Sequence, residues 1–107
     1  MVYKKKYYCT SGKNIIYMIE CNKENCEQRY IGETKFDLKT RTSQHLGYIN
    51  TKKFDQPTGK HFNQPVHSKH NLRATVLEKV KVNDLQYRKE REHFHIRKFQ
   101  TFTEDST

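Results

Sequence analysis

The chain has 107 residues, with 21 Lys and Arg against 12 Asp and Glu and a formal net charge of +9 at pH 7. This length gives one small domain with a modest core, a size that often needs a cross-link. The charge favours a polyanion such as DNA or RNA over an acidic small molecule. A membrane span is not expected, because no apolar run approaches the ~20 residues that a span needs.

The N-terminal residues and the cysteines indicate a reducing compartment. No apolar signal-peptide core follows Met1, since residues 3–8 read YKKKYY. The three cysteines, Cys9, Cys21 and Cys26, are an odd number. In a basic chain without a signal peptide this favours a metal site or free thiols over a disulfide framework. We therefore expect a nuclear or cytoplasmic protein.

The first half of the chain predicts a hairpin and a helix. Residues 1–13 are expected to be a basic N-terminal arm or linker, and a domain is expected over residues 14–100. The run NIIYMIE over residues 14–20 predicts a strand with Ile15, Tyr17 and Ile19 on one face and Ile16 and Met18 on the other. A second short strand is predicted over residues 28–32, close enough to form a hairpin.

A helix is predicted over residues 38–49, with Asp37 as its N-cap. Its stripe is formed by Leu38, Thr42, His45 and Ile49. Arg41 lies beside this stripe, one turn before His45, so these two side chains are expected to point the same way.

The second half predicts a loop, an irregular segment, a strand and a helix. Residues 52–60 contain Pro57 and Gly59 and predict a loop, and residues 61–70 are too broken for a regular helix. A strand is predicted over residues 74–82, with one face formed by Val76, Glu78 and Val80 and the other by Thr75, Leu77 and Lys79. Asp84 is expected to cap a helix to residue 99, with one side formed by Leu85, Arg88, Glu92, Ile96 and Phe99.

Residues 101–107 predict a polar tail. Three strands covered by helices make a small α+β domain.

Several side chains offer what phosphodiester cleavage requires. A phosphodiester is anionic, so the site must neutralise charge, activate water and protonate a leaving oxygen. Arg41 offers a planar fork that matches phosphate, and Glu92 offers the hard oxygen that Mg²⁺ prefers. Tyr17 and Tyr30 could serve as a base only if a metal or an arginine lowered the phenol pKa from ~10.

Each residue also has a structural interpretation. Tyr17 and Tyr30 are typical strand aromatics, and Arg41 is typical of a solvated helix face. Glu92 could pair with Arg88 at helical spacing, and Glu90 is a second candidate carboxylate. The joint pattern favours the nuclease interpretation.

The order and spacing of these residues resemble a known family. The frame I-I-Y, then Y-I-G-E-T, R-x3-H and R-E-x3-I on a late helix resembles the GIY-YIG endonuclease domain. The cysteines between the two halves, H-F-N-x2-V-H-S and R-E-H-F-H-I resemble the version carried by Penelope-like retroelements. Ile15 stands where the family name has glycine, and no asparagine follows Phe99.

The resemblance implies a three-stranded antiparallel sheet flanked by helices. It also implies hydrolysis with one divalent metal, Mg²⁺ or Mn²⁺, held by Glu92. Arg41 would hold the scissile phosphate and stabilise its extra negative charge.

The remaining roles are likewise implied by the resemblance. Tyr17 and Tyr30 match the two tyrosines, one of which would help to deprotonate or orient the attacking water. Gly32 matches the closing glycine, where the backbone passes near the site. His45 would assist proton transfer or bind phosphate.

A second metal site is suggested by Cys21-x4-Cys26 and His61-x5-His67, which supply a ligand set suited to tetrahedral Zn²⁺. Such a site would clip the hairpin to the irregular segment, and the Penelope-like resemblance implies it as a structural zinc. Alternatives are His70 in place of His67, a catalytic His61, or four side chains without a metal. Cys9 is expected to be a plain thiol.

The leading hypothesis is a divalent-metal-dependent DNA endonuclease that nicks target DNA for a mobile element. It implies DNA as partner and a reverse transcriptase domain in the full-length protein, with no small-molecule cofactor. One alternative is a zinc-stabilised nucleic-acid-binding module without cleavage activity. Another is a repair or restriction-type nuclease with the same chemistry.

Overall fold

A computed structural model describes the backbone of residues 2–4 and all of residues 12–99. The elements in chain order are β1 (Val2–Lys4), β2 (Ile15–Cys21), β3 (Arg29–Thr34), α1 (Leu38–Asn50), α2 (Pro57–His61), the 3₁₀ helix η1 (Lys69–Asn71), β4 (Leu72–Lys79) and α3 (Leu85–Phe99). Cys9, most of the predicted basic arm and the predicted polar tail over residues 101–107 lie outside the described residues. No helix in the described part is long and apolar enough to cross a lipid bilayer.

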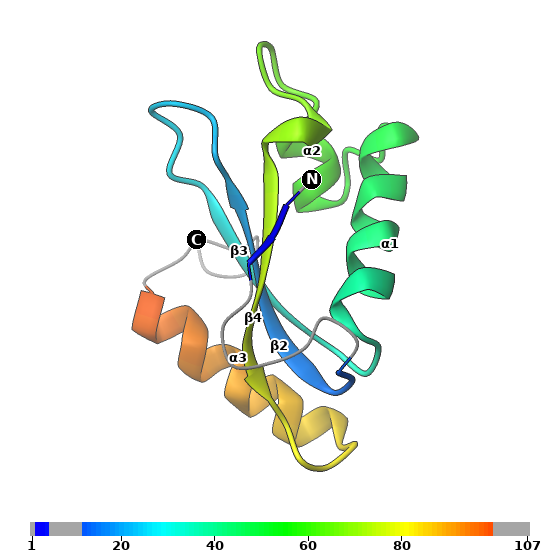
Figure 1. The fold of residues 1–107 in the computed structure, drawn as a ribbon, viewed down its shortest axis with the longest axis vertical. Helices are drawn as coiled ribbons and strands as arrows, with labels where there is room; N and C mark the ends of the chain where they lie inside the picture. Colours follow the sequence, from blue (N-terminus) through cyan, green and yellow to red (C-terminus); the bar gives the residue numbers. More distant parts are fainter. Residues whose placement is uncertain (1, 5–11, 100–107) are drawn as a thin grey trace.

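One sheet separates two helical layers. Its strand order is β1-β4-β2-β3, so β3 forms one edge. Helices α1 and α2 lie on one side of the sheet and α3 lies on the other (Figure 1). The α+β class is confirmed, as is the three-stranded antiparallel sheet formed by β3, β2 and β4. The short strand β1 adds to this sheet in parallel beside β4, within the segment predicted as an arm.

The central strand β2 supplies a core to both layers. Ile15, Tyr17 and Ile19 pack on the α1 side, as the predicted alternation requires. Ile16 and Met18 pack on the α3 side. Burying one large aliphatic side chain stabilises a fold by about 1.5–3 kcal/mol, so the two faces together fix β2 in the centre. Ile15 is fully buried, which explains how a side chain replaces glycine at the start of the first motif.

Helix α1 begins as predicted. The side chain of Asp37 accepts a hydrogen bond from the backbone N–H of Thr40 at 2.7 Å. This satisfies one of the free N–H groups of the first turn. The buried residues of the helix are the four predicted for its stripe, Leu38, Thr42, His45 and Ile49. The cap and the stripe therefore fix which side of α1 faces the sheet.

The alternation predicted for residues 74–82 is wrong beyond Val76. In the pairing with β2, Tyr17 lies opposite Val76 and Ile16 lies opposite Glu78, so the register shifts at this point. Such a bulge adds one residue to a strand and changes the face of those that follow. Val76 consequently packs on the α1 side and Val80 on the α3 side, although the pattern places them on one face.

Two further expectations need correction. The predicted loop over residues 52–60 ends in helix α2, which has Pro57 in its first turn, where proline is favoured. A Cβ on Gly59 would collide with the backbone oxygen of Lys53, so the glycine lets α2 pack against the preceding turn. On α3, Leu85 is exposed rather than part of the buried side, because the buried residues of this helix are Arg88 and His95.

Candidate active site and metal centre

A cavity of about 330 Å³ lies at the β3 edge of the sheet, where the α1 side meets the α3 side. All six residues predicted to take part in catalysis line it. They are Tyr17, Tyr30, Gly32, Arg41, His45 and Glu92. The structure thus brings together side chains from β2, β3, α1 and α3 that are up to 75 positions apart in the sequence.

Tyr17 forms the centre of a hydrogen-bonded group. The Nε–H of Arg41 donates to the phenol oxygen of Tyr17 at 3.0 Å. The same oxygen lies 2.9 Å from Nε2 of His45. Arg41 and His45 are one turn apart on α1, and both reach Tyr17, which confirms that they point the same way. Gln44 and Tyr48 also hold Arg41, since its NH1 lies 2.6 Å from Oε1 of Gln44 and 3.4 Å from the Tyr48 hydroxyl.

His45 is neutral in this arrangement. Burial, reinforced by the positive charge of Arg41, lowers the pKa of its imidazole to about 3. Its Nδ1 lies 2.7 Å from the Thr58 hydroxyl of α2. Because Arg41 Nε–H already donates to the phenol oxygen, we assign the tautomer in which Tyr17 O–H donates to Nε2 and Nδ1–H donates to Thr58. His45 therefore presents a free lone pair to the phenol, as an acceptor for its proton.

Tyr17 is a protonated phenol rather than a phenolate. Burial raises its pKa above the ordinary value, and the opposing effect of Arg41 is smaller. Tyr17 thus does not meet the condition for acting alone as a base. A phenol hydrogen-bonded to a neutral imidazole can instead accept a proton while it gives its own proton to the imidazole.

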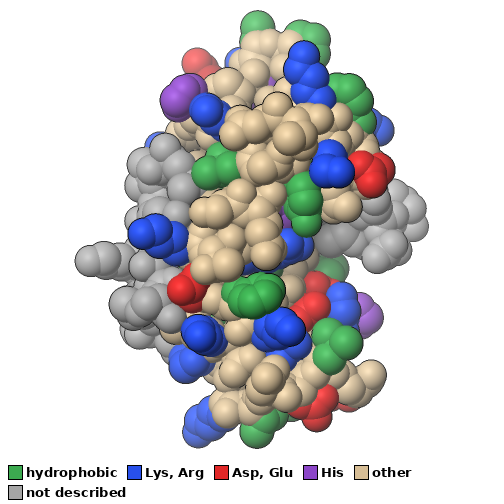
Figure 2. Space-filling view, turned by 90° about the vertical axis from the view of Figure 1, so that its right-hand side faces the viewer, with side chains coloured by type: hydrophobic (Ala, Val, Ile, Leu, Met, Phe, Trp, Pro, Cys, Tyr) green, Lys and Arg blue, Asp and Glu red, His purple; other side chains and the backbone are tan. Residues whose placement is uncertain are grey.

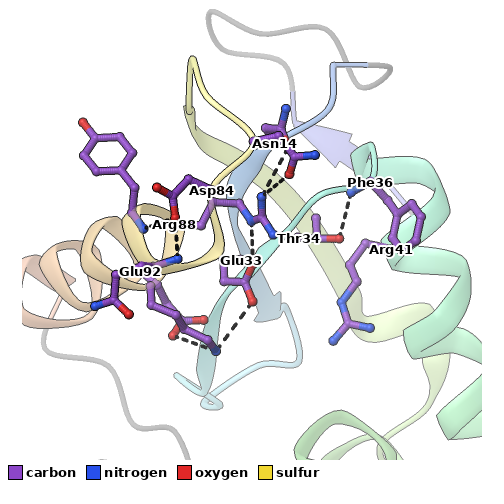
Figure 3. Close-up of polar contacts among 12 residues, drawn as sticks. Asn14, Glu33, Thr34, Phe36, Arg41, Asp84, Arg88 and Glu92 are labelled. Carbon is purple, nitrogen blue, oxygen red and sulfur yellow. Dashed lines mark hydrogen bonds and ion pairs between the residues drawn. The ribbon is translucent and has the colours of Figure 1, made fainter.

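Glu92 faces Arg41 from the opposite wall of the cavity. Its side chain is only 12% exposed, and its carboxylate pairs with Lys89 at 3.7 Å. Burial raises the pKa of the Glu92 carboxyl; Lys89 opposes the rise and Glu33 adds to it. Arg88 pairs with Glu33 rather than with Glu92 (Figure 3). Glu90 is exposed and is not among the residues of the cavity wall.

These properties fit a divalent cation at Glu92. A buried carboxylate is costly to keep charged, and a hard cation relieves that cost. Mg²⁺ usually binds one or two carboxylates and fills its other positions with water and substrate oxygens. The open side of Glu92 toward the cavity leaves room for both.

A second cluster brings the four predicted zinc ligands together. Ligand atoms of Cys21, Cys26, His61 and His67 all lie within 4.8 Å of one another. Sγ of Cys26 is 3.5 Å from Nε2 of His61. Nδ1 of His67 lies 3.1 Å from the carbonyl oxygen of Pro65, so Nε2 is left as the lone-pair nitrogen. That Nε2 is buried and has no hydrogen-bond partner within the described residues, as expected of a nitrogen that coordinates a metal.

The titration of Cys26 and His61 supports the same interpretation. Burial by itself raises the pKa of the Cys26 thiol, but a hydrogen bond from the Gln28 backbone and the proximity of His67 outweigh it and lower the pKa. Burial raises the pKa of the Cys21 thiol. Burial lowers the pKa of His61. Zn²⁺ binds thiolates and neutral imidazoles, so the shifts at Cys26 and His61 favour binding, whereas the shift at Cys21 opposes it until the metal is bound. The donor set therefore fits a closed tetrahedral zinc site.

The structure decides between the alternative roles considered for the histidines. His70 is exposed and does not belong to the cluster, whereas His67 does. His61 points its Nε2 at Cys26 and is not among the residues of the catalytic cavity. Its ring does contact Tyr30, with a centroid distance of 5.8 Å. The cluster thus lies next to the cavity and packs against one of its walls.

The sequence did not single out every residue of the cavity. Thr58 holds His45, and Glu33 lies beside Glu92, but neither was a candidate. Glu33 belongs to the Y-I-G-E-T run, which was the available signal. Glu33 is placed in the site by its proximity to Glu92 of α3, and this proximity exists only in the folded chain.

Comparison with known proteins agrees with this geometry. A family model described as the GIY-YIG catalytic domain matches residues 13–105. Comparisons with curated proteins and with solved structures gave no match.

Proposed function

This chain belongs to the GIY-YIG nuclease family, and on that premise we propose that it is a divalent-metal-dependent endonuclease that nicks DNA. One observation carries the proposal. Arg41, Tyr17 and His45 form a hydrogen-bonded group on one wall of a single cavity, and the Glu92 carboxylate lies on the other. A scissile phosphate between these walls would meet positive charge, a proton acceptor and a cation ligand together.

Arg41 is proposed to bind the scissile phosphate. Its guanidinium is fixed by Tyr17, Gln44 and Tyr48, so little side-chain freedom is lost when a phosphate binds. A preorganised donor of this kind acts where negative charge develops in the transition state. Glu92 would hold the divalent cation, which supplies further positive charge for the phosphate when bound.

Tyr17 and His45 are proposed to remove the proton from the attacking water. Water gives a proton to the phenol oxygen as the phenol gives its own proton to Nε2 of His45. The water oxygen then forms its bond to phosphorus, and the bond to the leaving oxygen breaks. The leaving oxygen takes a proton from solvent, and His45 loses its extra proton to solvent, since burial and the charge of Arg41 disfavour the imidazolium and keep the pKa of His45 low. Thr58 keeps His45 in the tautomer that can accept the proton.

DNA binding is supported by the charge of the chain. Lys and Arg side chains are spread over the face that carries α1, with acidic side chains between them (Figure 2). With a net charge of +9, such a surface attracts a phosphate backbone without reading its sequence. We infer that affinity comes mainly from this surface and that cleavage comes from the cavity.

The zinc cluster is proposed to have a structural role. The cluster brings the β2–β3 connection close to the segment that follows α1. Its cysteines lie at the end of β2 and in the β2–β3 connection, and its histidines lie at the end of α2 and after it. A site with four protein ligands has no open position for water or phosphate. The Cys2His2 set supports assignment to the version found in Penelope-like retroelements, and hence a role in a mobile element.

A plasmid-nicking assay tests the proposal. Zinc-loaded protein should convert supercoiled DNA to the open-circular form when Mg²⁺ or Mn²⁺ is added. It should not do so with Zn²⁺ alone. DNA binding without nicking under any divalent cation would instead identify a binding module without cleavage activity.

A further inference from the structure

Glu33 is held in place by a buried arginine. It follows Gly32 on β3, lines the catalytic cavity, and has a side chain that is only 14% exposed. Nε of Arg88 donates to Oε1 of Glu33 at 2.8 Å, and the side chain of Arg88 is 7% exposed. NH1 of Arg88 is held in turn by the side-chain oxygens of Asn83 and Asn14 at 2.7 and 3.4 Å. Figure 3 shows Arg88 reaching from α3 to Glu33. One carboxylate oxygen is thus fixed, and its orientation sets that of the other.

The second oxygen of Glu33 faces the same ammonium as Glu92. Nζ of Lys89 lies 3.6 Å from Oε2 of Glu33 and 3.7 Å from Oε1 of Glu92. Both distances exceed those of direct hydrogen bonds, and the Lys89 side chain is 48% exposed. A long pair that involves an exposed, flexible ammonium is weak, because solvent screens the charge and the side chain loses freedom when it is held. Lys89 therefore holds its position weakly, between two enclosed carboxylates.

We propose that Glu33 is a second carboxylate of the catalytic cation site and that Lys89 holds the place of the cation in the metal-free protein. The inference rests on the proposed function, because it takes Glu92 as the residue that binds the divalent cation. Arg88 acts as a positioning residue that orients Glu33 toward the cation. Such outer partners of a ligand commonly set metal affinity.

The charges of the cluster support the exchange. In the metal-free protein, the two carboxylates are balanced by Arg88 and Lys89. When a divalent cation takes the place of Lys89, the cluster gains one net positive charge, which matches one phosphodiester. The flexible Lys89, freed from the carboxylates, remains on the cavity wall and is available to the phosphate.

Mn²⁺ binding to zinc-loaded protein without DNA tests the inference. The binding can be followed by the electron paramagnetic resonance signal of free Mn²⁺. Glu33→Gln keeps an oxygen to accept from Arg88 but removes the charge, and it should weaken Mn²⁺ binding about 10–100-fold. Lys89→Met removes the competing ammonium and should tighten binding. Glu90→Gln and Lys98→Met change exposed residues of the same helix that do not line the cavity, and should bind as wild type does.

The outcomes separate the inference from the proposed function. Wild-type affinity in Glu33→Gln, together with weakened binding in Glu92→Gln, would overturn the role of Glu33 and leave the proposed function standing. Unchanged binding in Glu92→Gln would overturn the proposed function itself. Unchanged or weaker binding in Lys89→Met would overturn the role of Lys89. Melting curves and zinc content identify any variant that fails to fold, and misfolding cannot produce the tighter binding expected of Lys89→Met.

Discussion

The phenol of Tyr17 lies over Gly32. The two residues are paired across β2 and β3, and a Cβ added to Gly32 would lie only 2.5 Å from the phenol oxygen of Tyr17. That same oxygen contacts Arg41 and His45. The glycine of the second motif is therefore required by the tyrosine of the first, because any side chain at position 32 would displace the group at the centre of the site.

Gly32→Ala is expected to displace the Tyr17 phenol. Overpacking of this kind costs about 1–3 kcal/mol of stability, and nicking should fall along with it. Gly47→Ala is the matched control, since a Cβ there meets nothing within 4 Å. It replaces a helical glycine and should raise stability by about 0.8–1 kcal/mol. Urea unfolding and nicking rates measure both effects, and a fully active Gly32→Ala protein would contradict the role given to this contact.

His45 should make the fold sensitive to acid. Its pKa is about 3 in the folded chain against 6.5 in the unfolded chain, so the unfolded state binds more protons between these values. Stability should therefore fall as pH drops below 6.5, by about 2 kcal/mol between pH 7 and pH 5 from this residue alone. His45→Gln should lack this part of the loss. The comparison uses urea unfolding of both proteins at the two pH values, and parallel losses would show that His45 is not buried in its neutral form.

The stability of the fold should depend on bound zinc. Purified protein should carry about one Zn²⁺ per chain, and chelation should lower its melting temperature. His67→Gln should lose zinc, whereas His70→Gln should keep it, because only His67 belongs to the cluster. Metal analysis and thermal melting give both results. Full zinc content in His67→Gln would exclude the proposed ligand set.

DNA affinity should depend strongly on salt. If the Lys and Arg side chains contact several phosphates, the logarithm of the binding constant should fall with the logarithm of salt concentration by about 0.9 per contact on duplex DNA. Fluorescence anisotropy over a range of KCl concentrations measures the slope. An affinity that hardly changes with salt would argue against phosphate contacts as its source.

The parts of the fold that depend on local sequence were predictable. The alternation of Ile15, Ile16 and Tyr17 fixed the faces of β2, and Asp37 fixed the start of α1. The bulge between Val76 and Glu78 was not predictable, because it depends on pairing with β2 and leaves no local signal. Strand β1 likewise pairs with a strand some seventy residues away.

The candidate site was likewise predictable only in part. The six residues named from the resemblance to the family all line the cavity, and the spacing of Cys and His identified the cluster. Glu33, Thr58 and Gln44 were missed because each acts through a neighbour from another turn or element. Their positions follow from the fold, and single-residue preferences do not reveal them.

The most direct measurement is the rate at which the chain nicks supercoiled plasmid in Mg²⁺, compared among four proteins. Arg41→Ala removes a contact to the phosphate and should slow nicking about a hundredfold or more, or about 3 kcal/mol. Glu92→Gln keeps the shape but removes the charge that holds the cation, and should abolish nicking. Both variants should retain zinc, Glu92→Gln should bind DNA as wild type does, and Glu90→Gln should cut at the wild-type rate. Wild-type nicking by both Arg41→Ala and Glu92→Gln would contradict the account and place any activity elsewhere.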